Sequence, residues 1–568
     1  MTWLAAFALW SSLSYAKSAE QIWYNGSILT MNDAQPSAQA IAVTQGKIIA
    51  VGNQQEVMKL KNKKTRLTDL KGATLLPGFV DPHSHVSGVG LQAASANLLP
   101  PPDGANSSIA DIQKTLTDYI KSSENSKKYG GLVMGFGYDD SQLAEKRHPR
   151  RDELDSVSST LPIVIMHQSG HIGVMNSKAL ELAGITSSSP NPPGGIIVRK
   201  ANSQEPSGVL QENAYFLALH KVMPTLTEEQ SLAMLEEGQK LYLKYGYTTI
   251  QDGRSSPDQL KTFIAASKKK RLLADIVSYP DILMTGTDKL LKPPYYHNIS
   301  RTPQYQNHFR LGGVKVTLDG SPQGKTAWLT KPYYIPPEGE KKDYAGYGVV
   351  DDAKLIQVYE QALSNRWQIL THSNGDRATD QMITAMEAAQ KKFPHVEVRP
   401  VLIHGQVLRK DQVAKIKALG IIPSLFPMHT FYWGDWHRTS VLGPERAENI
   451  SPTGWVLEQK MIFTTHHDAP VVLPDSMRIL SATVTRKTRS GYTLGKNHKV
   501  DVLTALKAMT LWSAYQHWEE KSKGSLENGK LADFVILAKN PLQVPESELE
   551  KIQVLETIKE GKTIYKVP

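Results

Sequence analysis

Short apolar runs alternate with amphipathic stretches through the middle of the chain, and this alternation restricts the possible folds more than any other feature. Runs such as LPIVIMHQSG, LGGVKVTLDG, WQILTHSNGD and QKMIFTTHHD have the composition of buried strands. Residues 228–245 and 352–366 have instead the spacing of amphipathic helices. Repetition of these two patterns over residues 77–515 predicts a parallel βα architecture, whose strand ends would carry the active site.

The remaining sequence indicates two further parts. Residues 17–76 contain β-branched runs separated by Gly and Asn-Gly turns, and residues 516–568 repeat this texture. We expect the two ends to pair into one β domain, with everything between them inserted. Residues from about 95 to 240 exceed what one or two βα units require and contain loops rich in Pro, Gly and Ser. They predict a cap inserted over the mouth of a barrel.

An apolar stretch at the start of the chain predicts export. Residues 3–10 are apolar, and residues 14–16 (SYA) fit the small-x-small rule for cleavage of a signal peptide. We therefore expect residues 1–16 to be a signal peptide and the mature protein to be periplasmic or secreted. No Lys or Arg precedes the apolar stretch, so a buried N-terminal strand and a misplaced start codon are the alternatives. No apolar run approaches the ~18 residues of a membrane span, so no membrane association is expected after signal removal.

The net charge of the chain is strongly positive, at +10 with a pI of about 9.2. Basic clusters occupy residues 59–66 (KLKNKKTR) and 268–271 (KKKR). Such clusters can attract nucleic acid or an anionic surface. These two lack interleaved aromatic residues, which favours the solvated faces of a basic exported protein. We expect a small-molecule substrate and no nucleic-acid partner.

Two histidines, two positions apart, end the apolar run LPGFVDPHSH. On a strand, His83 and His85 would point to the same side, so both imidazoles could reach one ion; the alternative is two polar residues at an ordinary strand end. The chain contains no cysteine, so a metal site must use histidine, carboxylates or a modified lysine. Later strand ends supply such groups in Lys315, His372, His404 and Asp468. Their order on successive strands favours a hydrolytic metal site with an open position.

Several motifs resemble those of one known family and cover nearly the whole mature chain. LPGFVDPHSHV resembles its first metal motif, and GGVKVTLDGS, THSNGDRA, LIHGQ and DAPV resemble the motifs of its later barrel strands. RRDELDSVSSTLPIVIMHQSGHIGVMNSKALELAGI and KGSLENGKLADFVILAKNP resemble its characteristic middle segment and its C-terminal signature. The chain is thereby similar to the amidohydrolase superfamily, in the branch called amidohydrolase family 3, which includes YtcJ-like and N-substituted formamide deformylase-like enzymes.

This resemblance implies a fold and a metal content. The fold would be α/β, with a (β/α)8 TIM-like barrel and a small β-sandwich formed by both chain ends. One or two divalent ions, usually zinc, would bind at the strand ends. His83, His85 and Asp468 would hold the more buried ion, and His372 and His404 the second. Lys315 would bridge the two ions if carboxylated, because a free ammonium group has only donors; an unmodified lysine would leave a single ion.

The expected reaction is hydrolysis by metal-activated water, with Asp468 as general base and then general acid. Four further residues are candidates for substrate binding. His171 resembles a position that faces substrate, although a structural role is nearly as well supported. His429 and Trp433 lie in an aromatic-rich stretch that could line the pocket or pack against the cap. His467 directly precedes Asp468 and could contact substrate.

Three hypotheses for the function follow. The first is a metal-dependent hydrolase that cleaves a carbon–nitrogen bond, other than a peptide bond, in a small N-acyl or N-formyl compound. The second keeps the site and changes the bond to that of a lactone, an ester or a cyclic amide, since the same chemistry attacks all of them. The third is a non-catalytic exported protein that binds a small molecule and has a regulatory role, which the complete ligand set argues against. A homodimer is compatible with the resemblance, although no segment marks an interface.

Overall fold

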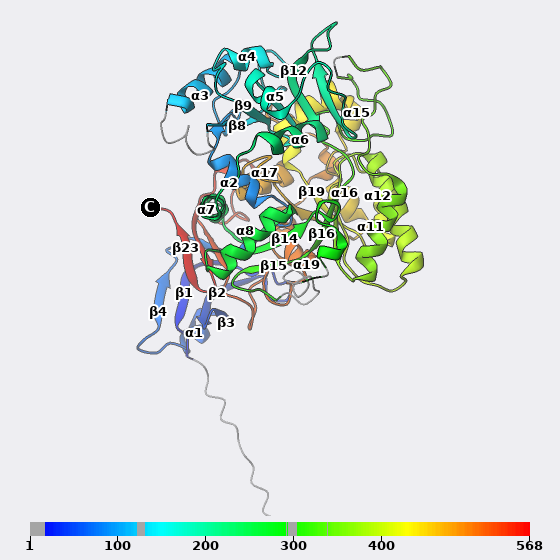
Figure 1. Cartoon of the computed structure of the whole chain (residues 1–568). Helices are drawn as coiled ribbons and strands as arrows, with labels where there is room; N and C mark the ends of the chain where they lie inside the picture. The colour runs from blue at the N-terminus through cyan, green and yellow to red at the C-terminus, as the bar shows by residue number, and fades with distance from the viewer. Residues whose placement is uncertain (1–17, 122–130, 291, 293–303, 338) are drawn as a thin grey trace, which may run out of the picture.

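The computed structural model describes residues 18–121, 131–290, 292, 304–337 and 339–568 (Figure 1). The expected signal peptide, residues 1–16, lies outside the described residues and stays a prediction. Among the helices that are described, none has both the length and the apolar character needed to span a membrane.

The two ends of the chain form one sheet of eight strands, drawn in blue and red at the lower left of Figure 1. The N-terminal strand β5 pairs antiparallel with the C-terminal strand β21, so that Leu76 lies opposite Val535. The ring of Trp23 packs edge-on against Phe534, with centroids 5.2 Å apart. The strands are β1 (Gln21–Leu29), β2 (Ser37–Thr44), β3 (Lys47–Gly52), β4 (Arg66–Asp69), β5 (Thr74–Pro77), β21 (Phe534–Leu537), β22 (Val554–Lys559) and β23 (Lys562–Lys566).

The middle of the chain is built from parallel strands that alternate with helices. A four-stranded sheet has the order β15-β14-β13-β6, and a five-stranded sheet runs in sequence order from β16 to β20. A bridge between Asp281 and Lys315 joins the two sheets. The strands are β6 (Phe79–Val80), β13 (Tyr247–Ser255), β14 (Asp275–Pro280), β15 (Phe309–Leu311), β16 (Gly313–Thr317), β17 (Gln368–Ser373), β18 (Val401–His404), β19 (Ile422–Leu425) and β20 (Thr464–Thr465).

Helices cover these strands, which are buried along their whole length in β16, β17 and β18. Strands of this kind read as continuous apolar runs because both of their faces are covered. The helix α8 (Pro257–Lys268) follows β13 and starts at a capping box between Ser256 and Gln259. The helices α11 (Asp352–Ser364), α12 (Asp376–Lys392) and α13 (Lys410–Ala418) separate the later strands. The expected βα alternation is therefore present.

A separate six-stranded sheet lies between β6 and β13 in the sequence, at the top of Figure 1. It has its own apolar clusters, one of them around Met134, Val164 and Leu210. The chain leaves it through α7 (Glu228–Lys244). This helix packs against α2 (Val86–Ala93), which begins directly after His85. The strands are β7 (Ala96–Asn97), β8 (Val133–Tyr138), β9 (Ile163–His167), β10 (Ile172–Met175), β11 (Gly195–Arg199) and β12 (Pro206–Glu212), and α6 (Asn213–Val222) follows β12. We call this sheet and its helices the cap; its predicted limits of about 95 and 240 stay a prediction.

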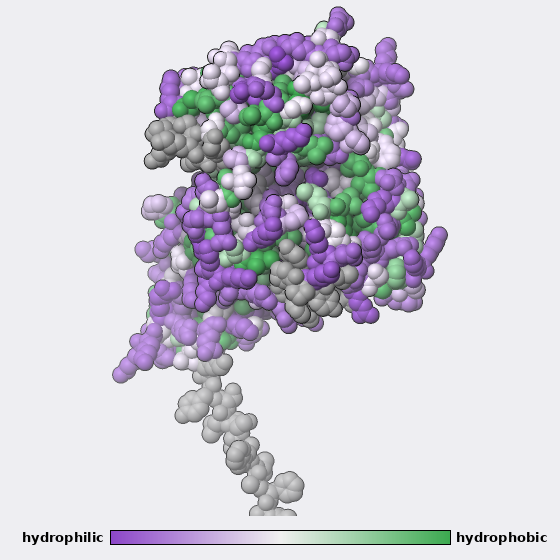
Figure 2. Space-filling view, viewed as in Figure 1, coloured by the Kyte–Doolittle hydropathy of each residue, from purple (hydrophilic) through white to green (hydrophobic). Residues whose placement is uncertain are grey.

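Hydrophilic side chains spread over most of the face shown in Figure 2, interrupted by scattered apolar groups. The basic cluster at residues 268–271 faces acidic residues of α7. Lys269 pairs with Glu228 at 2.6 Å, and Arg271 pairs with Glu229 at 2.6 Å and also with Glu236. Intramolecular pairing thus occupies two of the four basic side chains in this cluster.

Candidate metal centre and active site

The H-x-H motif lies immediately after β6 rather than on it, because this strand ends at Val80. The carboxylate of Asp81 accepts hydrogen bonds from the backbone N–H groups of His83 (3.1 Å) and Gln251 (3.0 Å), which fixes the turn. His85 pairs with Asp252 of β13 through a single bridge. Although the two histidines are not on a strand as expected, the turn brings both rings to one point.

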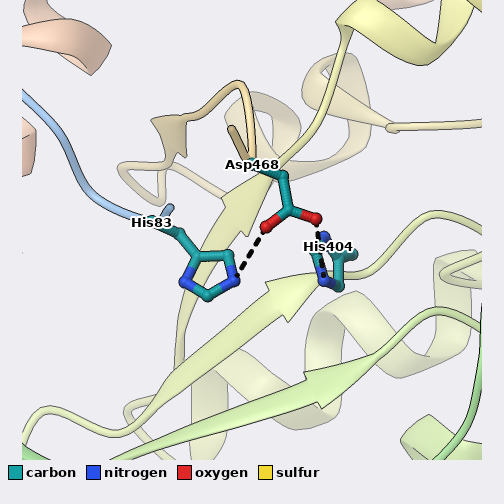
Figure 3. Close-up of side chains that lie close together, drawn as sticks. All are labelled: His83, His404 and Asp468. Carbon is teal, nitrogen blue, oxygen red and sulfur yellow. Dashed lines mark ion pairs between the residues drawn. The ribbon is translucent and has the colours of Figure 1, made fainter. Parts of the chain in front are cut away.

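That point is the carboxylate of Asp468, which follows β20. Its Oδ1 atom lies 3.2 Å from Nε2 of His83 and 3.1 Å from Nε2 of His85. Its Oδ2 atom lies 3.9 Å from Nε2 of His404, and Figure 3 shows His83 and His404 on either side of the carboxylate. His83, His404 and Asp468 each offer an atom within 4.8 Å of the others, as the ligands of one ion would.

The other predicted ligands adjoin this group. The Nζ atom of Lys315, on β16, lies 3.2 Å from Nε2 of His83. The Nδ1 atom of His372, at the end of β17, lies 3.1 Å from Nε2 of His404. All six residues proposed from the sequence as metal ligands therefore meet at the carboxyl ends of the parallel strands.

The electrostatics of this cluster suit a cation. Burial lowers the pKa of His83 to about 3 and holds the pKa values of His372 and His404 well below their usual range, so these rings are neutral and keep a lone pair for a metal. Burial alone would raise the pKa of Asp468, but the surrounding imidazoles hold it well below that of an ordinary carboxyl. Burial also lowers the pKa of Lys315 to about 7, which favours the neutral amine that carboxylation requires.

One carboxylate oxygen of the cluster is incompletely satisfied. Oδ1 of Asp468 is buried and lies 3.2 and 3.1 Å from Nε2 of His83 and His85, but no donor among the described residues meets it with hydrogen-bond geometry. An ionised oxygen left this way is costly unless a cation or donor reaches it. Neutral imidazoles around a bare carboxylate oxygen therefore fit a divalent ion, and imidazole with carboxylate is a ligand set that zinc accepts.

A small cavity of about 10 Å³ lies beside the cluster. Two of the four proposed substrate-binding residues, His171 and His429, line it. The cap contributes Ser169 and His171 to its wall. The other lining residues are Ser321, Gln323, His372, Asn374, His404, Phe426, His429, Asp468 and Val471. The wall is more polar than the aromatic pocket that the sequence suggested.

Trp433 and His467 do not line this cavity. Trp433 is fully buried behind His429, where its indole Nε1–H donates to Oδ2 of Asp139 at 2.6 Å. It packs the helix α14 (Met428–Trp436) against the cap, which was the alternative reading of this stretch. His467 is also fully buried, with its ring 5.5 Å from that of Tyr242 and its Nδ1 accepting a hydrogen bond from the backbone of Ala469.

Two residues outside the predicted set support the ligands. Nε2 of His466 lies 3.1 Å from Nδ1 of His404, on the side of the ring away from Asp468. Oε1 of Gln251 accepts a hydrogen bond from Nδ1 of His83 at 2.8 Å. Groups of this kind fix the tautomer and the orientation of a metal-binding imidazole. The run HHD contained a signal for His466, whereas nothing in the sequence around Gln251 marks its role.

Two other groups of titratable residues differ from this centre. Asp139, Asp140 and His167 cluster in the cap, where Nε2 of His167 lies 3.0 Å from Asp140 and the carboxylates raise the pKa of His167 to about 9 against the effect of burial. Asp275 meets His308 near the eight-stranded sheet formed by both chain ends, which we call the end sheet. The ammonium groups of Lys523 and Lys559 also contact Asp275. The protonated ring of His167 pairs with the first group of carboxylates and two ammonium groups pair with Asp275, so neither group resembles the metal centre.

Comparison with known proteins agrees with this geometry. Residues 66–565 match the model of the family described as "Amidohydrolase family". The chain is 25% identical to a putative amidohydrolase, YtcJ, of Bacillus subtilis (strain 168), over 96% of this chain and 99% of that protein. It is 25% identical to an N-substituted formamide deformylase of Arthrobacter pascens, over 95% of this chain and 97% of that protein.

A solved structure has the same fold. It is an uncharacterised metal-dependent hydrolase from Pyrococcus horikoshii OT3, with a TM-score of 0.72 and 24% identity over 93% of this chain and 99% of that one. The family match spans most of the sequence and includes the strands that carry the metal centre. The chain therefore belongs to the amidohydrolase family, and it is an enzyme of the metal-dependent hydrolase type.

Proposed function

We propose that this enzyme cleaves a carbon–nitrogen bond in a small N-acyl or N-formyl compound. The observation that carries the proposal is the meeting of four imidazoles, one lysine and one incompletely satisfied carboxylate at the carboxyl ends of the parallel strands. The relative described as an N-substituted formamide deformylase supports an amide as the substrate class. The fold we infer around the centre is a (β/α)8 barrel, with a β-sandwich at the joined chain ends.

The proposed metal is zinc, as one or two ions. His83, His85 and Asp468 would hold one ion, and His372 and His404 the other, with Lys315 between them if carboxylated. A bound divalent ion supplies Lewis-acid polarisation of a carbonyl and makes hydroxide available near neutral pH. The low proton affinity of the buried imidazoles supports this assignment, because a neutral ring keeps the lone pair that a ligand needs.

The proton transfers fall to Asp468. Its carboxylate would take a proton from the attacking water and deliver it to the nitrogen of the leaving amine. A divalent ion held by the neighbouring residues would keep this carboxylate ionised, as a general base must be. His429 would border the substrate in this cavity, with the ring of Trp433 packed against it.

A hydrolysis screen tests the proposal. Zinc-loaded protein is incubated with formamides, N-acyl amino acids, lactones and cyclic amides, and release of amine or acid is measured. We expect turnover of formamides or N-acyl compounds. Turnover of lactones alone would move the function to ester chemistry, and no turnover of any class by protein that has bound zinc would contradict a hydrolase.

The location and the partners of the enzyme are also proposed. We infer a periplasmic or secreted protein with a small-molecule substrate, no nucleic-acid partner, no membrane association after signal removal, and homodimerisation as in many barrel enzymes. The internal pairing of the basic cluster supports the absence of a nucleic-acid partner. N-terminal sequencing of exported protein should begin near Lys17, and the mass in solution should equal two chains.

A further inference from the structure

The metal centre is open to solvent on the side of His85. The side chain of His85 is 29% exposed, whereas those of His83 and His404 are buried. The cavity of about 10 Å³, which His372 and His404 line and His85 does not, has room for little more than one water molecule. A substrate larger than a formyl or similarly small acyl group must therefore extend toward His85.

Arg254 lies on this open side, near the end of β13. Asp252, two residues earlier, forms a bridge with His85. A Cβ atom at Gly253 would lie only 2.3 Å from Cε1 of the His83 ring, so this end of the strand packs directly against the proposed metal ligands. Arg254 is the next residue, and its side chain is 32% exposed. A cationic group thus borders the accessible side of the metal centre.

Two elements hold the guanidinium group of Arg254 in place. Its Nε–H donates to Oδ2 of Asp281, directly after β14, at 3.0 Å. Its central carbon lies 5.4 Å from the centre of the Phe216 ring, on α6 of the cap. A cation over an aromatic face is attracted to it. Arg254 therefore lies where the cap meets the parallel strands, and these contacts restrict the conformations of its side chain.

The contact with Asp281 leaves most donors of Arg254 unused. A guanidinium group has five N–H donors, and Asp281 accepts one of them. Oδ1 of Asp281 accepts instead from the backbone N–H groups of Leu283 and Met284, at 2.9 and 3.1 Å, at the start of α9 (Ile282–Thr285). No described residue accepts a hydrogen bond from the two terminal amino groups of Arg254. These groups form the planar fork that matches a carboxylate.

Arginines that serve only as internal partners behave differently in this protein. Arg399 contacts Glu520 through both terminal nitrogens, at 3.1 and 3.0 Å. Arg271 contacts Glu236 through Nε and one terminal nitrogen. In both cases the fork is used on a carboxylate of the chain. Arg254 contacts its carboxylate through Nε alone, so its fork is left for a partner from outside the protein.

We propose that Arg254 binds a carboxylate on the amine portion of the substrate, so that the enzyme acts on N-acyl amino acids and related N-acyl carboxylates in preference to neutral amides. The small acyl group lies toward the enclosed cavity, the carboxylate lies at Arg254, and the scissile bond lies between them at the metal centre. This inference rests on the proposed amide hydrolysis and narrows its substrate class.

A matched pair of substrates tests this selection. The zinc-loaded enzyme is given an N-acyl amino acid with the acyl group that the hydrolysis screen identifies, such as N-formyl-leucine, and its carboxamide, such as N-formyl-leucinamide. Release of the acyl group as acid gives kcat and KM for each. We expect wild type to prefer the carboxylate by roughly 10-fold or more in kcat/KM, mainly through a lower KM, because hydrogen bonds between charged groups are strong.

In Arg254→Met, which removes the charge and keeps the length of the side chain, this preference should largely disappear. The two compounds have nearly the same shape, and both are measured on the same sample, so steric effects and the fraction of active enzyme cancel in the ratio. Equal hydrolysis of both compounds by wild type, or an undiminished preference in Arg254→Met, would overturn the inference. Absence of turnover of every amide in the screen would contradict the proposed function itself.

Arg438→Met is the matched control. The side chain of Arg438 is 31% exposed, lies over the ring of Tyr492 at 3.9 Å and approaches Glu448 at 3.8 Å, but it lines neither the metal centre nor the cavity. This variant should keep the wild-type preference. Loss of the preference in both variants would overturn the inference, because the effect would then not be specific to Arg254.

Arg254→Lys keeps the test decisive if Arg254→Met does not fold. Its ammonium group can still pair with Asp281, which protects the buried carboxylate. A single ammonium group cannot hold Asp281 and also present a fork to the substrate. The preference for the carboxylate should therefore fall through a higher KM, and an undiminished preference in the folded Arg254→Lys protein would overturn the inference.

Discussion

Two buried carboxylates lie toward opposite ends of the parallel strands, and their surroundings differ sharply. Asp275 begins β14, and its oxygens receive Lys523 at 2.6 Å, Lys559 at 2.7 Å and His308 at 2.7 Å. Asp468 follows β20 and has imidazoles rather than ammonium groups as neighbours, and no described donor meets its Oδ1 with hydrogen-bond geometry. The first carboxylate is fully paired within the protein, and the second is left incomplete.

This difference indicates that Asp275 contributes to stability, whereas Asp468 serves the function. Lys559 belongs to β22, so the pairing of Asp275 ties the end sheet to the parallel strands. In βα barrels, the amino-terminal face of the strands serves stability, while the carboxyl-terminal face carries the reaction. An incomplete carboxylate at that second face costs stability that only a bound cation recovers, which is the pattern expected of a metal centre.

The largest expected effect comes from Asp468→Asn. The amide cannot take a proton from water, so kcat should fall by about 10²–10⁴-fold. The thermal stability of the metal-free protein should stay unchanged or rise, because an incompletely paired buried charge is removed. Steady-state kinetics and thermal denaturation measure the two quantities. Activity close to that of wild type would contradict the role of Asp468 as general base.

Asp275→Asn should give the reverse result. Removal of this carboxylate leaves two buried ammonium groups without a shared partner, and loss of one member of a buried ion pair costs about 3–5 kcal/mol of unfolding free energy. Bound metal and the kcat of the folded fraction should not change. Urea denaturation and metal analysis test this prediction. A stability equal to that of wild type would contradict the proposed difference between the two sites.

An intermediate effect is expected for His466→Asn. The variant loses the ring that faces Nδ1 of His404, and the loss of such a supporting group lowers metal affinity by about 10–100-fold. Zinc affinity is measured by competition with a chelator. His220→Asn, on the exposed side of α6, is the matched control and should bind zinc as wild type does.

The smallest effect concerns acid stability. Burial opposes ionisation of Asp275, but Lys523 and Lys559 hold its folded-state pKa well below the ordinary value of 3.8. A depressed carboxyl pKa contributes stability above the unfolded pKa, and this contribution declines as pH falls below that value. Between pH 4 and 3, the free energy of unfolding should therefore fall less steeply in Asp275→Asn than in wild type, by up to about 1.4 kcal/mol per pH unit. If the two proteins gave parallel profiles of unfolding free energy against pH, the pKa of Asp275 would not be depressed in the folded state.

The strand ends were the part of the site that the sequence could predict. His372 and His404 end apolar runs, and parallel strands present their ends on one face, so their convergence follows from the pattern. The role of Trp433 was harder to predict, because an aromatic residue at a barrel mouth can line a pocket or pack behind it. The choice depended on Asp139, almost 300 positions earlier, which receives its indole N–H.

The contribution of the cap could not be predicted in the same way. Glu212 lies in a region without a metal motif, and its contact with His171 follows from the pairing of β10 with β12, which local sequence does not specify. The neighbours His466 and His467 show the same limit. Adjacent side chains after a strand point in different directions, and only the fold decides that His466 turns toward His404 while His467 turns toward Tyr242.

The metal content of the protein tests the central claim most directly. Chelator-free protein and a His83→Asn/His85→Asn double variant are compared by inductively coupled plasma mass spectrometry, with folding of both checked by thermal denaturation. We predict one or two zinc ions per wild-type chain and a loss of at least one ion in the folded double variant. A wild-type chain without bound metal, or a double variant with undiminished metal, would contradict the assignment of this cluster as the metal centre.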